Sequence, residues 1–93
     1  MDRYVRKNDP RATVVEAVQL TKHNVKEVAE WCVGREVEEI DALDPEKRWV
    51  GINVITWEGL KRLSEGDFLV LDAMGDFHIR WPEQFEITFE KIS

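Results

Sequence analysis

The chain has 93 residues, of which 43% are hydrophobic and 34% are charged, and its formal net charge is −6. This length and composition fit one folded globular domain, and they exclude two independent cores and an intrinsically disordered chain. The acidic balance argues against general binding to nucleic acid, because that affinity comes mainly from clustered Lys and Arg.

The first expected element is a strand over residues 13–20, where β-branched residues are frequent. Apolar residues fall on both of its faces, so we predict a central position in a sheet. Residues 1–12 hold four basic side chains against two acidic ones, and we predict a flexible basic N-terminal arm there. The whole chain, residues 1–93, is expected to form a single domain.

A helix is predicted over residues 24–33. Asn24 is a suitable N-cap, and Glu27 completes a capping-box pattern with it. Gly34 is expected to end the helix as a left-handed residue. Apolar residues recur at i, i+3, i+4 and i+7 and form one stripe: Val25, Val28, Ala29 and Cys32.

The middle of the chain reads as short strands joined by turns. Residues 35–40 fit an edge strand, and residues 41–47 fit a loop containing Pro45. Residues 57–63 leave two alternatives, a helical turn or a bend at Glu58-Gly59 that returns as a strand. Residues 49–57 fit another strand, whose expected core contributors are Val50, Ile52, Val54 and Ile55.

The C-terminal third predicts a hairpin of residues 68–72 and 77–81 around the turn Met74-Gly75-Asp76. Pro82 begins a short helical turn over residues 82–85, and the alternation in residues 87–92 predicts a final strand. We therefore predict an α+β fold, with one N-terminal amphipathic helix packed on a small antiparallel or mixed sheet.

The residues that carry catalysis or bind metals are sparse. His23 and His78 are the only histidines, and we interpret His78 as an ordinary strand histidine and not as a metal ligand with Asp72 or Asp76. Cys32 lies on the apolar stripe and is expected to be a buried structural thiol. No nucleophile motif or glycine-rich phosphate loop occurs in the sequence. We predict that the protein is not an enzyme and uses no cofactor or metal.

Cellular location follows from what the chain lacks. Its longest apolar run is Phe68–Leu71, much shorter than the roughly 20 residues of a membrane helix. Residues 1–7 lack the apolar core of a signal peptide, and one cysteine cannot form an intramolecular disulfide. We predict a cytoplasmic protein without membrane insertion.

Tryptophans and a run of acidic residues are the strongest indications of a partner. Trp31 lies outside the apolar stripe of the helix, so it is half exposed or covered by another element. Residues 36–46 hold six acidic side chains and no basic one. This run is either a solvated strand edge or a docking face for a basic partner. Because tryptophan dominates binding hot spots, the predicted partner-binding residues are Trp31, Trp49, Trp81, Glu36, Glu38 and Glu39.

Several short motifs along the chain form a recognisable series. They are Tyr4-Val5-Arg6-Lys7, Val15-Glu16-Ala17-Val18-Gln19, the helix from Asn24 to Gly34, Gly66-Asp67-Phe68-Leu69-Val70, Gly75-Asp76-Phe77 and Pro82-Glu83-Gln84-Phe85-Glu86. In this series the chain resembles a family of small, largely uncharacterised bacteriophage and prophage proteins, mycobacteriophage proteins among them. It departs from their pattern at residues 8–12 and by an insertion at residues 41–49.

The resemblance implies a phage origin, an α+β fold and no catalytic motif. By analogy with small phage proteins, it implies a protein in the cytoplasm of the bacterial host that binds and inhibits or redirects one host protein, such as a growth or cell-division scaffold.

Two alternatives to this function stay open. One is a protein that sequesters a small nucleotide signal, with its phosphate bound by Arg35, Arg48, Arg62 or Arg80. The other is a role in phage assembly. An exposed strand edge would also allow a homo-oligomer in any of these cases.

Overall fold

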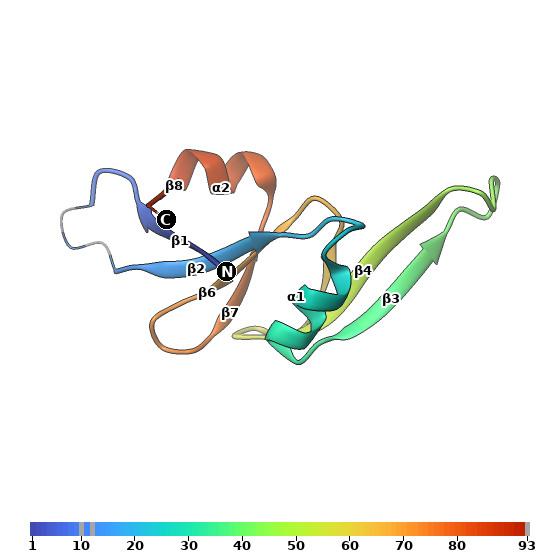
Figure 1. Cartoon of the computed structure of the whole chain (residues 1–93), viewed down its shortest axis with the longest axis horizontal. Coiled ribbons are helices and arrows are strands. Elements are labelled where there is room, and N and C mark those ends of the chain that lie inside the picture. The colour runs from blue at the N-terminus through green and yellow to red at the C-terminus, as the bar shows by residue number, and fades with distance from the viewer. Residues whose placement is uncertain (10, 12, 93) are drawn as a thin grey trace.

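A computed structural model describes residues 1–9, 11 and 13–92 of the chain. Over these residues it contains two antiparallel sheets and two short helices (Figure 1). The elements in chain order are β1 (Asp2–Arg6), β2 (Val15–Gln19), α1 (Val25–Cys32), β3 (Arg35–Ile40), β4 (Arg48–Thr56), β5 (Gly59–Ser64), β6 (Phe68–Leu71), β7 (Phe77–Arg80), α2 (Pro82–Thr88) and β8 (Phe89–Lys91).

The predicted fold class, one helix packed on one small sheet, is wrong. The structure is mostly β, with a five-stranded sheet in the order β7-β6-β2-β1-β8 and a separate three-stranded sheet in the order β3-β4-β5. The second sheet arises because β3, β4 and β5 follow one another through short connections and pair in register only among themselves. A second helix, α2, was expected only as a single turn.

The five-stranded sheet confirms the central position predicted for β2, which pairs with β1 on one side and with β6 on the other. Of the segment predicted to be a basic arm, residues 2–6 form β1. Tyr4 of this strand pairs with Val15 and with Lys91, so β1 has a neighbour on both sides. Pro10 and Ala12 of the same segment lie outside the described residues.

Helix α1 confirms the predicted helix and packs against both sheets. Its buried residues belong to a core that we call the α1 cluster: Leu20, Val28, Ala29, Cys32, Ile52, Val54, Leu63 and Leu69. Burial raises the pKa of the Cys32 thiol. Trp31 packs edge to face on Phe77, with ring centroids 5.2 Å apart. This contact confirms that another element covers Trp31.

The two ends of α1 differ from the predicted caps. Asn24 precedes the helix, but its side chain accepts a hydrogen bond from the Thr21 amide and donates one to the Gln19 carbonyl. The left-handed residue at the C-terminal end is Val33, with φ of 51°, and not Gly34. Gly34 is required for another reason, because a Cβ there would lie 2.5 Å from Cγ2 of Ile52.

Val33 offers a stabilising substitution. Its side chain is 93% exposed, so it contributes little packing, and a β-branched residue is strained in the left-handed region. Val33→Gly is expected to raise the free energy of unfolding by about 1 kcal/mol, measured by urea denaturation. A loss of stability in this variant would contradict the assignment of strain to Val33.

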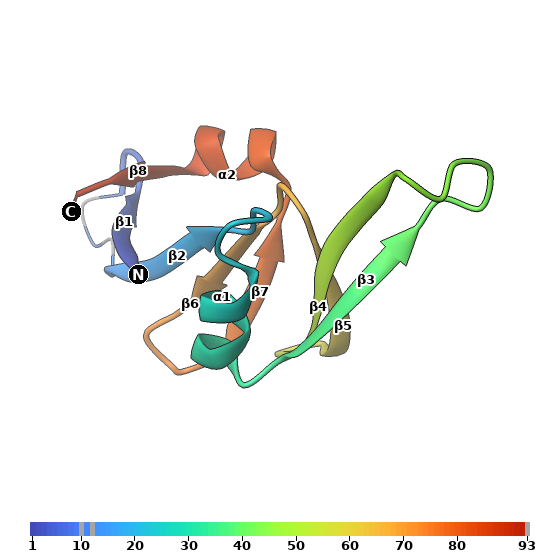
Figure 2. The same cartoon turned by 45° about the vertical axis from the view of Figure 1, so that its right-hand side comes forward.

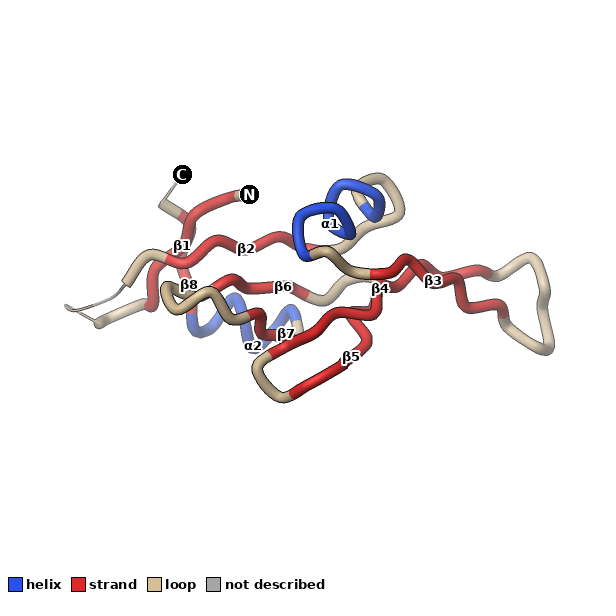
Figure 3. The backbone as a smooth tube through the Cα atoms, turned by 90° about the horizontal axis from the view of Figure 1, so that it is seen from below, coloured by secondary structure: helices blue, strands red, loops and turns tan. Residues whose placement is uncertain are grey.

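Helix α2 covers the opposite face of the five-stranded sheet, as Figure 3 shows with α1 and α2 on either side of β2 and β6. Phe85 stacks on Phe68 at a centroid distance of 3.9 Å and on Phe89 at 5.0 Å, and it meets the edge of Tyr4 at 4.9 Å. These residues define the α2 cluster, whose buried members are Ala17, Phe68, Val70, Phe85 and Phe89.

The final strand predicted over residues 87–92 is wrong in its first part. Residues 87 and 88 belong to α2, and β8 begins only at Phe89. The Thr88 hydroxyl donates to the Gln84 carbonyl, and the Phe89 amide donates to the Phe85 carbonyl. These bonds continue the helix past the point at which alternation alone predicted extended chain.

Strands β3 and β4 form a long hairpin that projects from the body of the molecule (Figures 1 and 2). We call residues 35–53 the arm. The molecule measures 48 × 23 × 22 Å along its principal axes, and the arm forms one end of the longest of them. The edge strand, the loop and the return at Glu58-Gly59 as β5 are confirmed. Among the predicted core residues of β4, Ile52 and Val54 are buried, but Ile55 is 77% exposed because it faces away from α1.

Neither helix among the described residues has the length and apolar character that crossing a membrane demands.

Candidate ligand-binding site

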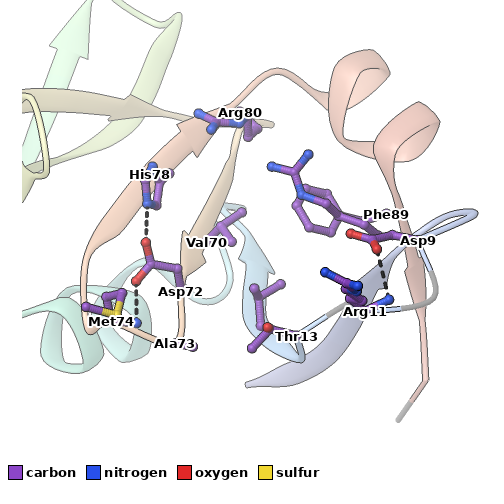
Figure 4. Close-up of a pocket in the computed structure, with 12 residues that line it drawn as sticks. Asp9, Arg11, Thr13, Val70, Asp72, Ala73, Met74, His78, Arg80 and Phe89 are labelled. Atoms are coloured by element: carbon purple, nitrogen blue, oxygen red, sulfur yellow. Dashed lines mark hydrogen bonds and ion pairs between the residues drawn. The ribbon is translucent and has the colours of Figure 1, made fainter.

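Beside α2, the five-stranded sheet carries a cavity of about 340 Å³ on the face of the α2 cluster (Figure 4). We call it the sheet cavity. Its lining residues are Arg6, Asp9, Arg11, Thr13, Val15, Val70, Asp72, Ala73, Met74, His78, Arg80 and Phe89.

Strand register explains why these distant residues meet. Val70 is paired with His78, and Arg6 is paired with Phe89, and paired residues share one face of a sheet. Arg80 follows His78 by two residues and therefore lies on the same face. The cavity thus joins the β6–β7 hairpin to the strands at the far edge of the sheet.

Three arginines, Arg6, Arg11 and Arg80, line the cavity together with apolar side chains such as Val15, Val70 and Phe89. The Arg6 guanidinium lies 5.6 Å from the centroid of the Phe89 ring, and Arg80 donates a hydrogen bond of 3.0 Å to the Ile79 carbonyl. None of the three forms an ion pair with any residue that the structure describes. These arginines therefore retain most of their hydrogen-bonding capacity for an external anion.

The two carboxylates in the lining are already engaged. Oδ1 of Asp72 accepts hydrogen bonds from the amides of Met74 (2.9 Å) and Asp76 (3.0 Å). Oδ2 of Asp72 lies 2.6 Å from Nε2 of His78, and Oδ1 of Asp9 accepts from the Arg11 amide at 2.9 Å. Both carboxylates stay negatively charged, so the lining holds three basic arginines against two acidic residues, a small basic excess.

His78 lines the end of the cavity that lies beside the β6–β7 turn, where it contacts Asp72. Its contact with Asp72 indicates that Nε2 carries a proton directed at the carboxylate. Nδ1 is buried and has no hydrogen-bond partner among the described residues. The described residues also contain no group of three or more His, Cys, Asp or Glu side chains that could hold a metal.

Asp72 makes the stability of the fold depend on pH. The Asp76 amide and the His78 side chain are the main causes that hold the pKa of Asp72 below its ordinary value of 3.8. A lowered pKa stabilises the folded state above the ordinary value, and this contribution disappears as the pH falls through the folded pKa.

We therefore expect the melting temperature of Asp72→Asn to fall less steeply than that of wild type between about pH 5 and pH 2.5. Scanning calorimetry across this range measures the difference. The control is Asp76→Asn, whose carboxylate accepts no hydrogen bond from a described residue. Parallel curves for wild type and Asp72→Asn would contradict the role given to Asp72.

The predicted partner-binding residues do not form one surface. Trp31 is half-buried beside the α1 cluster, whereas Trp49 is 43% exposed on the arm and Trp81 is 70% exposed before α2. The three predicted glutamates, Glu36, Glu38 and Glu39, lie exposed on β3. Glu38 forms an ion pair with Arg48, and Glu39 forms one with Arg62.

Of the arginines considered as phosphate ligands, only Arg80 lines the sheet cavity. Arg48 and Arg62 form ion pairs with glutamates of β3, and Arg35 is exposed on β3. Arg6 was missed because residues 1–12 were expected to be a flexible arm. The signal for it was the alternation of Tyr4 and Arg6, which places both side chains on one face of a strand.

Comparisons of the chain with protein-family models, curated proteins and solved structures give no match. The resemblance to phage proteins therefore stays a prediction carried by the motifs themselves.

Proposed function

We propose that this chain is a non-catalytic binding protein that holds a small organic anion in the sheet cavity. The observation that carries this proposal is the set of three guanidinium groups without ion-pair partners among the described residues. All three line one cavity, although the chain has 19 acidic and 13 basic residues and therefore more carboxylates than basic groups to pair with.

The chemistry of the cavity supports an anion that also has apolar surface. Guanidinium groups bind carboxylates and phosphates through paired, charge-assisted hydrogen bonds. Val15, Val70 and Phe89 offer an apolar floor for the rest of the ligand. A volume of about 340 Å³ lies near the lower end of the range for ligand sites, roughly 300–1,000 Å³, so the bound group is small.

Calorimetric titration with a panel of small carboxylates and phosphates tests this proposal. Arg80→Gln and Arg6→Gln are each expected to weaken binding about tenfold or more, because each removes a charge-assisted contact worth about 1.5–3 kcal/mol. Arg35→Gln is the matched control, since Arg35 is exposed and outside the cavity. The proposal fails if no anion of the panel binds, or if Arg35→Gln weakens binding as much as Arg80→Gln.

A second proposal, binding of a host protein, is favoured by the composition of the arm. Trp49 is exposed there together with Ile40 and Leu43, beside acidic side chains of β3 and the following loop. An exposed tryptophan within a charged surround suits an anchor for a partner protein with a basic surface. The resemblance to phage proteins and the single cysteine support a bacterial cytoplasm as its setting.

Affinity purification from bacterial lysate, with wild type and Trp49→Ala in parallel, tests this second proposal. A partner recovered in near-stoichiometric amount with wild type should be lost with Trp49→Ala. Equal recovery with both proteins would exclude the arm as its binding surface.

A further inference from the structure

We infer that the anion bound in the sheet cavity carries a planar aromatic ring, and that this ring binds in an adjacent groove between Trp57 and Trp81. The ligand class is thus an aromatic phosphate or carboxylate, of which a nucleotide is a suitable probe. This inference rests on the proposed binding of an anion and goes beyond it by assigning a second subsite.

The groove has a volume of about 490 Å³ and lies where the β4–β5 turn meets β7 and the start of α2. We call it the Trp groove. The residues that matter for the argument are Trp57, Lys61, His78 and Trp81, all of which line it. Trp57 is 61% exposed and Trp81 is 70% exposed, so both indoles present aromatic surface to solvent.

The backbone on each side of the groove is held in place. The Trp57 amide donates a hydrogen bond of 3.1 Å to the Phe77 carbonyl, which ties the β4–β5 turn to β7. The Trp81 carbonyl accepts a hydrogen bond of 2.9 Å from the Phe85 amide in the first turn of α2. Because this backbone is already held, stacking of a flat ring has to order only the side-chain torsions of the two indoles.

The groove and the sheet cavity are neighbours because His78 lines both. The centroid of its ring lies 5.8 Å from that of Trp57, and its Nε2 contacts Asp72 within the sheet cavity. His78 stands on β7, an edge strand of the five-stranded sheet that contributes residues to both linings. A single ligand crossing this strand can place its anion near Arg80 and its ring near Trp57.

Charge favours the same class of ligand. Lys61 forms no ion pair with a described residue, whereas Arg62 beside it is paired with Glu39. Glu58 is the one carboxylate in the lining of the groove. The ring subsite therefore also tolerates an anionic ligand, and a neutral ring compound without the anionic group should bind less tightly.

Two pairs of probes separate the ring from the anion: phenyl phosphate against methyl phosphate, and adenosine 5′-monophosphate against ribose 5-phosphate. Titration followed by tryptophan fluorescence and by calorimetry gives each affinity. The ring-bearing member of each pair is expected to bind about 5- to 100-fold more tightly, as base stacking on aromatic side chains does elsewhere.

The variants Trp57→Ala and Trp81→Ala should remove most of this difference and leave the affinity for methyl phosphate unchanged. Trp57→Phe and Trp81→Phe keep a ring and should retain most of it. Trp49→Ala, at an exposed tryptophan outside both hollows, is the matched control and should change neither affinity.

The outcomes separate the two proposals. If no phosphate binds at all, the proposed function fails and this inference fails with it. If both members of each pair bind equally, or if the alanine variants weaken both members alike, anion binding stands and the ring subsite is overturned. Circular dichroism of each variant confirms that a lost affinity is not a lost fold.

Discussion

Replacing Phe85 with alanine is expected to lower the free energy of unfolding by about 3–5 kcal/mol. The Phe85 side chain is only 2% exposed and stacks on Phe68 and Phe89, with Tyr4 against its edge. Its removal leaves a cavity under α2 that the surrounding rings cannot fill without losing their own contacts. A domain of this size has little stability in reserve, so the variant approaches unfolding at ambient temperature.

Urea denaturation of wild type, Phe85→Leu and Phe85→Ala measures this loss in steps. The matched control is Ile87→Ala, because Ile87 lies in the same helix but is exposed. Ile87→Ala is expected to change the free energy of unfolding by less than about 0.5 kcal/mol. A change below about 1 kcal/mol for Phe85→Ala would show that α2 contributes little to the core.

The second large effect is expected at Gly34, which follows α1 at its point of contact with β4. A Cβ at this position would lie 2.5 Å from Cγ2 of Ile52, 2.8 Å from Sγ of Cys32 and 3.0 Å from the Asn53 carbonyl oxygen. Gly34→Val must therefore push α1 away from the sheet. We expect a loss of about 3 kcal/mol, the upper part of the usual range for overpacked cores.

Gly75→Ala separates this steric effect from backbone conformation. Gly75 has φ of 86° but open space around it, so only conformational strain, about 1–2 kcal/mol, should result. Thermal unfolding of both variants provides the comparison. Equal losses at the two glycines would contradict a packing role for Gly34.

The sequence predicted those elements that are determined by neighbouring residues. Helix α1 follows from one apolar stripe, and all three buried residues of the helix lie on that stripe. The β6–β7 hairpin follows from the turn residues between Asp72 and Asp76, and Gly75 there has the positive φ that such turns require. Local signals of this kind need no knowledge of the rest of the fold.

Sheet membership could not be predicted in the same way. Nothing near β3 or β5 indicates that these strands pair only with β4 and leave the first sheet. The strand Phe89–Lys91 is three residues long, and its partner β1 lies at the other end of the sequence. Pairings of this kind depend on tertiary packing, which short-range patterns do not report.

The same limit explains what was found and missed in the sheet cavity. Arg80 could be named from its place in the hairpin, but the approach of Arg6 and Arg11 depends on the order of strands across the whole sheet. The exposed acidic side chains of β3 were correctly located on an edge strand by composition alone. What they bind stays a prediction.

The α2 cluster has a consequence for the kinetics of folding. Tyr4, Phe68 and Phe89 come from strands that are far apart in the sequence, and β1 meets β8 only when the two ends of the chain are brought together. Closing so long a loop costs more entropy than forming the nearby contacts of the three-stranded sheet. The sheet cavity is therefore expected to be among the last parts of the molecule to form during refolding. An anion that binds there should slow unfolding and leave the early steps of folding unchanged.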